Sequence, residues 1–438
     1  MPAQETLVNK VLKVFAIVYL VWLIAAVLAY KTEFVQLLFT NVFFGVYSTC
    51  VTLYIISRFV LSMFYRSSPD AGIEPHVAIV MPAFNEQDAI AASLRSLLGL
   101  AYPPEKLELV AVNDGSTDAT LAEMNAVATE SAGRVSVIDF PENRGKRAAM
   151  AAGIRATSAD TIVFVDSDSV VEPDALRLLV QPLADSRVGA VCGHADVLNV
   201  RETWLTRMQA VRYFVAFRVV KAAESVFNAV TCCSGCFSAY RREAIMPRLE
   251  WWENQTFLGV ESTFGDDRSL TNCVLRDWRI VYEKQAISHT IVPSTFRAFV
   301  KQQTRWKRSW TRESVMVSRF IWRKHPVAAA FTYLSIVLPL IAPVAAVHSI
   351  AWGPLLQDST LPLIYVAGLY SLAIVYSLYY VLFQDRYSAI WMYGVLFVFF
   401  YLAIMLWQTY YAIATCRTVS WGTRPATAGL AGGGGGGA

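Results

Sequence analysis

Two aspartates one residue apart follow an uncharged apolar run in the middle of the chain. Asp166 and Asp168 come directly after residues 161–165 (TIVFV), a pattern typical of a buried strand. Two carboxylates at a strand end offer hard oxygen ligands that suit Mg²⁺ or Mn²⁺. An ion held there would bridge a nucleotide diphosphate and neutralise the charge that builds as it departs. A turn or helix cap is the alternative interpretation, because Asp and Ser favour both.

Two earlier polar clusters also follow apolar runs. The first contains four candidate substrate-binding residues: Pro82, Ala83, Asn85 and Glu86. In the second, Asp114 precedes Gly115. An aspartate beside a glycine can hydrogen-bond a uracil edge or a ribose hydroxyl without side-chain bulk closing the pocket. Asp-Gly is also a common turn, so this motif alone leaves both interpretations open.

Two later motifs combine acidic, basic and aromatic residues. Residues 265–268 (GDDR) contain three candidate catalytic residues: Asp266, Asp267 and Arg268. Residues 302–306 (QQTRW) contain four candidate binding residues: Gln302, Gln303, Arg305 and Trp306. A carboxylate beside a sugar hydroxyl can act as general base, an arginine can hold a diphosphate, and tryptophan offers a flat face to a sugar. The alternative is a salt-bridged loop followed by an amphipathic helix at a membrane.

The polar clusters need elements that bring them together. Apolar runs predict strands at residues 76–81, 107–112, 135–139, 161–165 and 189–192. Helical spacing predicts helices at residues 86–100 and 144–157. This alternation indicates a mostly parallel sheet with helices on both faces. Ligands bind such sheets at the carboxyl ends of the strands, where the polar clusters fall.

The rest of the chain is unusually apolar. Only 16% of its residues are charged, against about 25% in soluble domains. Five uncharged runs are long enough to cross a membrane: residues 14–30, 35–57, 326–357, 359–384 and 387–416. The first two predict a helical hairpin with its turn at residues 31–33. The last run could instead re-enter the membrane, or split into an interfacial piece and a span.

Basic residues set the expected orientation. They flank the membrane runs at Arg58, Arg66, Arg323 and Lys324, whereas the outer turns hold Lys31 and Asp358. The positive-inside rule therefore places the central domain of a multi-pass plasma or inner membrane protein in the cytosol. The formal net charge is only +4, so no nucleic-acid partner is expected.

The order of these features predicts five segments. They are an N-terminal membrane hairpin (1–66), a cytosolic α/β domain (72–293), interfacial helices with the QQTRW motif (294–325), a C-terminal membrane region (326–416) and a cytosolic segment with a flexible tail (417–438). In the interfacial helices, Arg and Lys side chains would reach lipid headgroups. Four aromatic residues would face the membrane or a polymer: Phe296, Phe299, Trp306 and Trp310.

The ordered motifs NDG, DSD, GDDR and QQTRW, with membrane runs on both sides, resemble one known group of enzymes. These are the processive inverting family 2 glycosyltransferases that make hyaluronan, chitin and cellulose, and the resemblance covers nearly the whole chain. Residues 233–235 (CSG), 254–259 (NQTFLG) and 421–424 (WGTR) are most similar to hyaluronan synthases, followed by nodulation-type chitin oligosaccharide synthases. The resemblance implies a glycosyltransferase A-type, Rossmann-like α/β domain between transmembrane helices.

The resemblance also implies roles on the donor side. Asp114 would contact the uridine, Asp166 the ribose or diphosphate, and Asp168 the Mg²⁺ or Mn²⁺ ion. Arg305 would bind the diphosphate. Lys146, in the stretch NRGKR, lies where the family places a basic residue near the donor, and a surface charge run is the alternative interpretation.

On the acceptor side, Asp267 would be the general base and Trp306 would stack on the acceptor sugar. The CSG motif would line the acceptor entrance with Cys233, Ser234 and Gly235. A gate over the diphosphate would be formed by Trp421 and Arg424. The CSGC spacing could alternatively be a redox or zinc pair.

Two positions depart from the family pattern. Asn113 stands where the family usually has a further acidic residue, so any role of that carboxylate is absent. Cys236 replaces a proline often found after CSG, which could alter the acceptor entrance.

The resemblance implies an enzyme that polymerises UDP-GlcNAc and UDP-GlcA into hyaluronan and exports the growing polysaccharide through its own membrane channel. The alternatives are a chitin oligosaccharide synthase, a single-transfer lipid-linked glycosyltransferase, and a transporter or receptor with a degenerate nucleotide-sugar domain.

Overall fold

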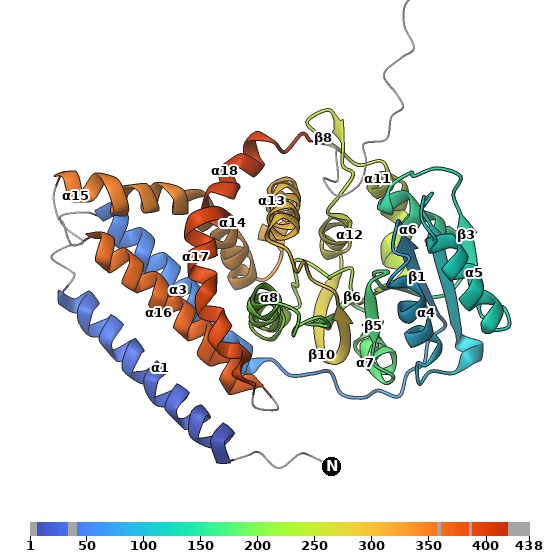
Figure 1. Ribbon diagram of the computed structural model, residues 1–438, viewed down its shortest axis with the longest axis horizontal. Coiled ribbons are helices and arrows are strands. Elements are labelled where there is room, and N and C mark those ends of the chain that lie inside the picture. The colour runs from blue at the N-terminus through green and yellow to red at the C-terminus, as the bar shows by residue number, and fades with distance from the viewer. Residues whose placement is uncertain (1–6, 34–41, 357–360, 385–387, 419–438) are drawn as a thin grey trace, which may run out of the picture.

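A computed structural model describes residues 7–33, 42–356, 361–384 and 388–418 of the protein. An α/β domain, with its sheet built from residues 77–290, lies beside a group of long helices from both ends of the chain (Figure 1). The predicted gate residues Trp421 and Arg424 lie outside the described residues.

Eight strands form one mixed sheet in the order β3-β2-β1-β4-β7-β6-β10-β5. They are β1 (Val77–Ala83), β2 (Leu107–Asn113), β3 (Val135–Asp139), β4 (Thr161–Phe164), β5 (Ser169–Val171), β6 (Val188–Val197), β7 (Ser238–Arg241) and β10 (Arg279–Thr290). All five predicted strands are confirmed. The first four strands in this order are parallel, as are β6 and β10. However, β7 runs antiparallel to both neighbours and β5 runs antiparallel to β10.

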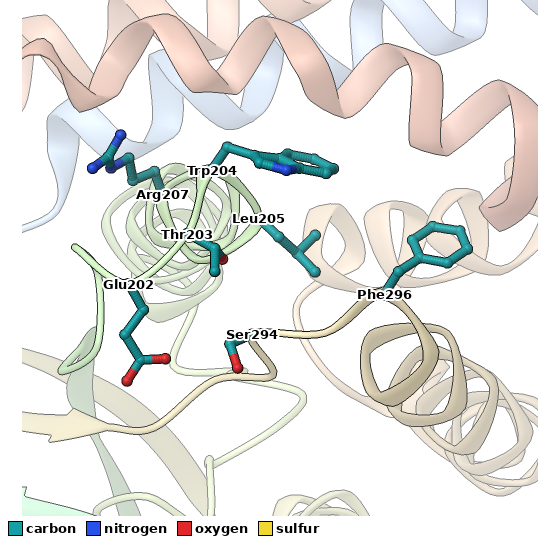
Figure 2. Close-up of a pocket in the computed structure, with 7 residues that line it drawn as sticks. All are labelled: Glu202, Thr203, Trp204, Leu205, Arg207, Ser294 and Phe296. Carbon is teal, nitrogen blue, oxygen red and sulfur yellow. The ribbon is translucent and has the colours of Figure 1, made fainter.

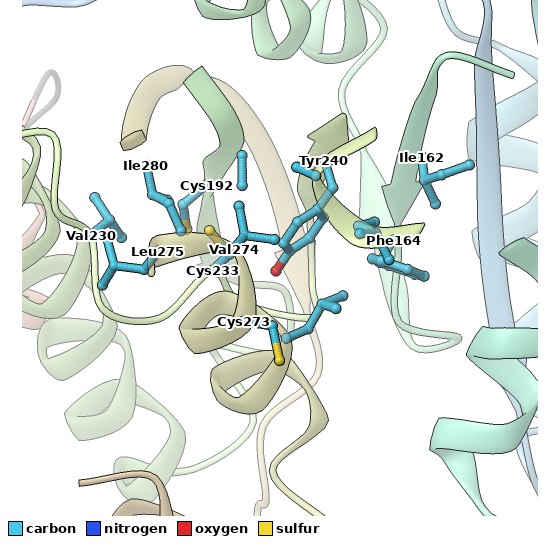
Figure 3. Close-up of a cluster of buried hydrophobic side chains, with 14 of the residues drawn as sticks. Ile162, Phe164, Cys192, Val230, Cys233, Tyr240, Cys273, Val274, Leu275 and Ile280 are labelled. Atoms are coloured by element: carbon cyan, nitrogen blue, oxygen red, sulfur yellow. The ribbon is translucent and has the colours of Figure 1, made fainter. Parts of the chain in front are cut away.

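Strand β1 is apolar throughout because helices cover both faces of the sheet. In β1, Val77 and Ile79 point into one core and Ala78 and Val80 into the other, since successive side chains of a strand alternate. The first core is covered by α4 (Ile90–Leu98), α5 (Thr120–Glu130) and α7 (Ala175–Val180). The second is covered by α6 (Lys146–Arg155), α10 (Arg242–Ile245), α11 (Leu249–Glu253) and α12 (Asp266–Leu275). Figure 3 shows part of this second core.

Four helices in the described part of the chain are long and apolar enough to cross a membrane. They are Gly45–Phe64 in α3 (Val42–Phe64), Pro326–Leu355 in α14 (Pro326–Val347) and α15 (Gly353–Leu356), Leu361–Phe383 (α16), and Ala389–Ala414, which includes α17 (Phe397–Phe400) and α18 (Leu406–Ala414). They match the second to fifth predicted runs.

The first predicted run lies in α1 (Leu7–Glu33), which packs on α16 through Ala16, Leu378 and Val381. The hairpin turn predicted at residues 31–33 is wrong, because these residues continue the helix.

Arg58 does not follow the second membrane helix, contrary to the prediction. It lies within α3 with only 5% of its surface exposed. Its guanidinium sits over the rings of Tyr54 and Phe331, 4.9 and 4.5 Å from their centres, and such cation–π contacts offset part of the cost of burying a charge. The orientation argument therefore depends on Arg66 and on the basic residues before α14.

Two further helices lie between the sheet and the membrane helices (Figure 1). The first is α8 (Trp204–Val215), and the second is α13 (Phe296–Ser318), which carries the QQTRW motif. Phe299 on α13 was expected to face the membrane or a polymer, but it is fully buried against Leu205 and Met208 of α8. That part of the prediction is wrong, because α8 and Phe400 cover this face of α13. Trp306 keeps 37% of its surface exposed.

Candidate active site

The loops after β1 and β2 are joined by hydrogen bonds. Asn85, at a φ of 55° that asparagine tolerates, accepts a bond from the backbone N–H of Thr117 at 2.8 Å. The hydroxyl of Thr120 accepts a bond from the backbone N–H of Glu86 at 2.7 Å. These bonds fix the rim of the sheet edge where β1, β2 and β4 end together.

Asp114 is buried at the end of β2 and connects this strand to the loop before α6. Its Oδ1 accepts bonds from the backbone N–H groups of Arg144 and Gly145 at 2.8 and 3.1 Å. Its Oδ2 accepts a bond from the side-chain amide of Asn143 at 3.0 Å. Gly115 is required beside it, because a Cβ there would lie 2.3 Å from the backbone carbon of Glu142. Asp114 therefore positions the loop that leads into Lys146.

Asn113 shows why the first acidic position of the family pattern can be absent here. Its amide donates to Oδ1 of Asp139 at 2.7 Å, and its Oδ1 accepts from the backbone N–H of Ser116 at 3.3 Å. A carboxylate at residue 113 would face the carboxylate of Asp139, and like charges at this distance repel.

Asp166 forms an ion pair with Lys146, the first residue of α6. Burial disfavours the charged form of Lys146, but the carboxylates of Asp166, Asp266 and Asp267 outweigh this effect and raise its pKa. Gly235 allows the close packing, since a Cβ there would lie 2.9 Å from Oδ1 of Asp166. Lys146 thus belongs to a half-buried acidic cluster. This excludes the alternative interpretation that it is only part of a run of surface charges.

Asp168 is also half-buried, and its Oδ1 accepts a bond from the hydroxyl of Thr290 on β10 at 3.2 Å. Burial raises the pKa of Asp168 to about 6, and the negative charge of Asp166 adds to the shift. A cation between the two carboxylates would stabilise their charged forms and so offset the effects of burial and repulsion. Within the described ranges no group of three or more His, Cys, Asp or Glu could hold a metal ion, so a metal here would need further ligands from substrate or water.

The two aspartates at the start of α12 have different environments. Asp266 is 4% exposed and its Oδ1 accepts a bond from Nε of Arg147 at 3.0 Å. This buried pair fixes α12 against α6, so the prediction that Asp266 is catalytic is replaced by a structural role. Asp267 is partly exposed; its Oδ1 accepts from the backbone N–H of Arg268 at 2.7 Å, and Sγ of Cys232 lies 3.8 Å from its Oδ2.

The start of α12 packs directly on α13. Gly265 has a φ of 83°, and a Cβ added there would lie 1.9 Å from Oγ of Ser309. The guanidinium of Arg312 lies over the Phe264 ring at 4.1 Å and donates to the Phe264 carbonyl. The helix with the QQTRW motif therefore sets the position of Asp267.

One narrow cleft gathers residues from five of the predicted motifs. It is lined by Pro82, Lys146, Asp166, Gly235 and Asp267, together with the side chains of Met150, Phe164 and Val165. Arg305 of α13 lies near enough for the charges of Asp266, Asp267 and Asp166 to act on its guanidinium. The cleft thus contains acidic groups and a lysine at one edge of the sheet, within range of the charge of Arg305.

Cys233 does not line an entrance to this cleft. Its side chain is fully buried among the apolar residues of the second core (Figure 3), and its backbone N–H donates to the hydroxyl of Thr271 at 2.9 Å. Ser234 is half-buried. This part of the sequence prediction is wrong because the chain turns inward at Cys233 before β7.

Two residues of α8, Arg212 and Tyr213, lie near Trp306, and no sequence motif singled them out. The Tyr213 ring lies 6.4 Å from the Trp306 ring, and the carboxylates of Asp166 and Asp168 act on its phenol. Arg212 donates to Oε1 of Gln303 at 2.6 Å. Neither residue belongs to a motif, and the only sequence signal is an Arg–Tyr pair within a helix that has many aromatic residues.

A larger cavity lies away from the acidic cluster. It has a volume of about 610 Å³ and is lined by residues from the starts of α8 and α13: Glu202, Thr203, Trp204, Leu205, Arg207, Ser294 and Phe296 (Figure 2). None of the sequence-predicted site residues lines it.

Comparisons with known proteins decide the family. Residues 78–248 match the family described as Glycosyl transferase family 2. Hyaluronan synthase of Streptococcus pyogenes is 30% identical to this chain over 384 residues, which cover 87% of this chain and 90% of that protein. The chain belongs to glycosyltransferase family 2. It is a membrane-associated glycosyltransferase, since the likeness extends over its apolar helices as well.

Two further proteins are similar to this family 2 glycosyltransferase, one in sequence and one in structure. An N-acetylglucosaminyltransferase of Rhizobium meliloti is 38% identical over 245 residues, or 55% of this chain and 57% of that protein. A mannosyltransferase of Pyrobaculum calidifontis, solved in complex with GDP-Man and Mn²⁺, has a TM-score of 0.57 and 20% identity, with 84% of this chain and 98% of that chain covered. The likeness in structure confirms the predicted glycosyltransferase A-type fold.

Proposed function

We propose that this family 2 glycosyltransferase polymerises UDP-GlcNAc and UDP-GlcA into hyaluronan and exports the chain across the membrane. The likeness to hyaluronan synthase over 87% of the chain is the observation that carries this proposal. The cleft supports it, because it brings two of the predicted donor residues, Lys146 and Asp166, and the predicted base Asp267 to one sheet edge.

Asp267 is the general base of the proposed reaction. It takes the proton from an acceptor hydroxyl while that oxygen attacks the anomeric carbon of the donor sugar. The new glycosidic C–O bond forms as the bond from the anomeric carbon to the diphosphate breaks, and UDP leaves with the electron pair. Lys146 and Arg305 offset the charge on the leaving diphosphate. One base and one set of cations are sufficient for this inverting transfer.

A divalent ion fits the acidic end of the cleft. Asp166 and Asp168 would hold it, since burial raises the pKa of Asp168 and the negative charge of Asp166 adds to the shift, so a cation between them would be stabilised. Mg²⁺ or Mn²⁺ bound there supplies electrostatic stabilisation of the diphosphate. The mannosyltransferase of similar fold was solved with Mn²⁺, which supports the same class of cofactor.

The acceptor lies between the cleft and the membrane helices in this proposal. Trp306 stacks on the acceptor sugar, because this residue is 37% exposed and its ring lies 6.4 Å from the ring of Tyr213. With the central domain in the cytosol and the polypeptide spanning the membrane several times, the growing chain would pass from Trp306 between the apolar helices.

A two-donor polymer assay tests the product. The purified full-length protein is incubated with UDP-GlcNAc alone, with UDP-GlcA alone and with both, and the polymer is then treated with hyaluronidase or chitinase. We expect polymer only with both donors, and its complete loss to hyaluronidase. Chitinase-sensitive polymer from UDP-GlcNAc alone would contradict the proposal.

That second result would support a chitin oligosaccharide synthase. The 38% identity to the N-acetylglucosaminyltransferase over 245 residues favours this alternative. The likeness to this enzyme covers only 55% of the chain, so chitin oligosaccharide synthesis is the second candidate function.

A further inference from the structure

Arg212 carries a positive charge that no described acidic residue neutralises. Arginine stays protonated at neutral pH even when buried. Among the described residues, the only polar partner of its guanidinium is the neutral amide oxygen of Gln303, at 2.6 Å. Burial lowers the pKa of Arg212 to about 10, and no carboxylate counters this effect in the described part of the chain. Arg212 is half-buried, and a cation withdrawn from water in this way is more stable when an anion accompanies it in the working protein.

The surroundings hold the guanidinium in one place. It lies over the Trp306 ring at 5.8 Å and over the Phe397 ring at 5.5 Å from their centres. Gln303 and Trp306 come from α13, and Phe397 comes from the last membrane helix. Arg212 therefore lies where the cytosolic domain meets that helix, on the side of Trp306 toward the membrane helices.

A second cation increases the positive potential at this place. Lys307 donates to the carbonyl of Met405 and the hydroxyl of Thr409, both neutral groups of the last membrane helix. Burial lowers the pKa of Lys307 to about 8, and the charge of Arg212 adds to the shift. An anion bound between these side chains would face two cations. Neither cation is paired with a carboxylate in the described part of the chain.

We propose that Arg212 binds the carboxylate of a uronic acid unit in the growing polymer. The inference rests on the proposed function, because only a chain that contains glucuronate carries such a group. In an alternating polymer, the neighbour of a GlcNAc stacked on Trp306 is a glucuronate. A guanidinium fixed by Gln303 and two rings presents its remaining N–H groups as a planar fork, which suits a carboxylate.

Binding of defined oligosaccharides tests this role without requiring turnover. The full-length protein in phosphatidylcholine nanodiscs is titrated into fluorescein-labelled hyaluronan tetrasaccharide and into the labelled neutral GlcNAc tetramer. We expect Arg212→Gln to raise the Kd of the acidic tetrasaccharide about tenfold or more, the range for a lost hydrogen bond to a charged group. The Kd of the neutral tetramer should stay within about twofold. Arg212→Lys should give an intermediate Kd, because it keeps the charge and loses the fork.

Arg207→Gln is the matched control. Arg207 lies on the same helix, but it donates to the hydroxyl of Tyr393 at 2.8 Å and lines the separate larger cavity. An equal loss of acidic tetrasaccharide binding in this variant would show a nonspecific charge effect and overturn the inference. A thermal unfolding midpoint equal to that of the wild type would show that Arg212→Gln is folded. If it is not folded, Arg212→Lys provides the test in its place.

The outcomes separate this inference from the proposed function. Wild-type preference for the acidic tetrasaccharide that persists in Arg212→Gln and Arg212→Lys would overturn only the role of Arg212. A wild-type protein that binds the neutral tetramer and not the acidic one would contradict both.

Discussion

Lys146 and Asp166 form an ion pair that joins the first turn of α6 to the loop after β4. Their side chains are only 21% and 26% exposed. The pair keeps a cation in the cleft beside two aspartates, Asp166 and Asp168, that would otherwise repel each other. We expect the lysine to turn toward the diphosphate when a divalent ion takes its place near Asp166.

Lys146→Met should lower kcat/KM for the nucleotide sugar about 100-fold, the usual effect of removing one group that stabilises developing charge. The KM should rise as well, because Asp166 then lacks its partner. UDP release measured against donor concentration gives both values. Arg155→Gln serves as the control, since it removes a cation from the other end of α6 that pairs with Glu253 at the surface. Equal losses in the two variants would contradict a donor role for Lys146.

Asp267→Asn should reduce kcat by about 10²–10⁴, because amide nitrogen cannot accept the acceptor proton. The affinity for UDP should change little, since Lys146 and Arg305, the proposed cations for the diphosphate, remain. The measurements are UDP release and calorimetric binding of UDP. Asp277→Asn, just beyond the end of α12 and paired with Arg248 at the surface, is the matched control. Unchanged UDP release in Asp267→Asn would remove the catalytic assignment and favour a degenerate binding domain.

Divalent ions should stabilise the protein more at pH 7.5 than at pH 5.5. The folded-state pKa of Asp168 is raised to about 6, above its ordinary value of about 3.9. The folded state therefore binds a proton more tightly than the unfolded state, and this stability contribution is lost as the pH rises through about 6. Above that pH the carboxylate is charged and can bind Mn²⁺. Thermal unfolding with and without Mn²⁺ measures the difference, and chelation should abolish it.

Asp168→Asn should remove the pH dependence of this Mn²⁺ effect. A variant that retains the full pH-dependent shift in Tm would show that the metal binds elsewhere.

Gly265→Ala should impair catalysis far more than Gly259→Ala. Both glycines have positive φ, at 83° and 79°, so each alanine variant should lose about 1–2 kcal/mol of stability from backbone strain. Only at Gly265 does the new Cβ meet another atom, Oγ of Ser309 at 1.9 Å. The resulting shift of α12 would displace Asp267. Turnover of UDP-sugar in both variants tests this, and Ser309→Gly added to Gly265→Ala should restore part of the activity.

The sequence predicts the sheet edge well because its signals are local. Strands β1, β2 and β4 are buried on both faces, so they appear as continuous apolar runs, and the polar residues that follow them must fall at one edge. The strand β7 was missed because Ser238–Arg241 is short and half polar. Its position matters, since the turn before it brings Gly235 against Asp166.

Pairings between distant segments could not be predicted. Nothing near Asp266 indicates that Arg147, 119 residues earlier, neutralises it, and the adjacent Asp267 has the same side chain. Burial separates them, and burial depends on how α6 packs against α12. Arg212 and Tyr213 were missed for a similar reason: their importance comes from the α13 side chains beside them.

Synthesis joined to export is the central claim, and proteoliposomes test it most directly. The protein is reconstituted into sealed vesicles, and both UDP-sugars are supplied only outside, where outward-facing catalytic domains can use them. We predict that radiolabelled polymer collects in the lumen, resists hyaluronidase added outside and becomes sensitive after detergent. Polymer that external hyaluronidase digests fully in intact vesicles would contradict the account.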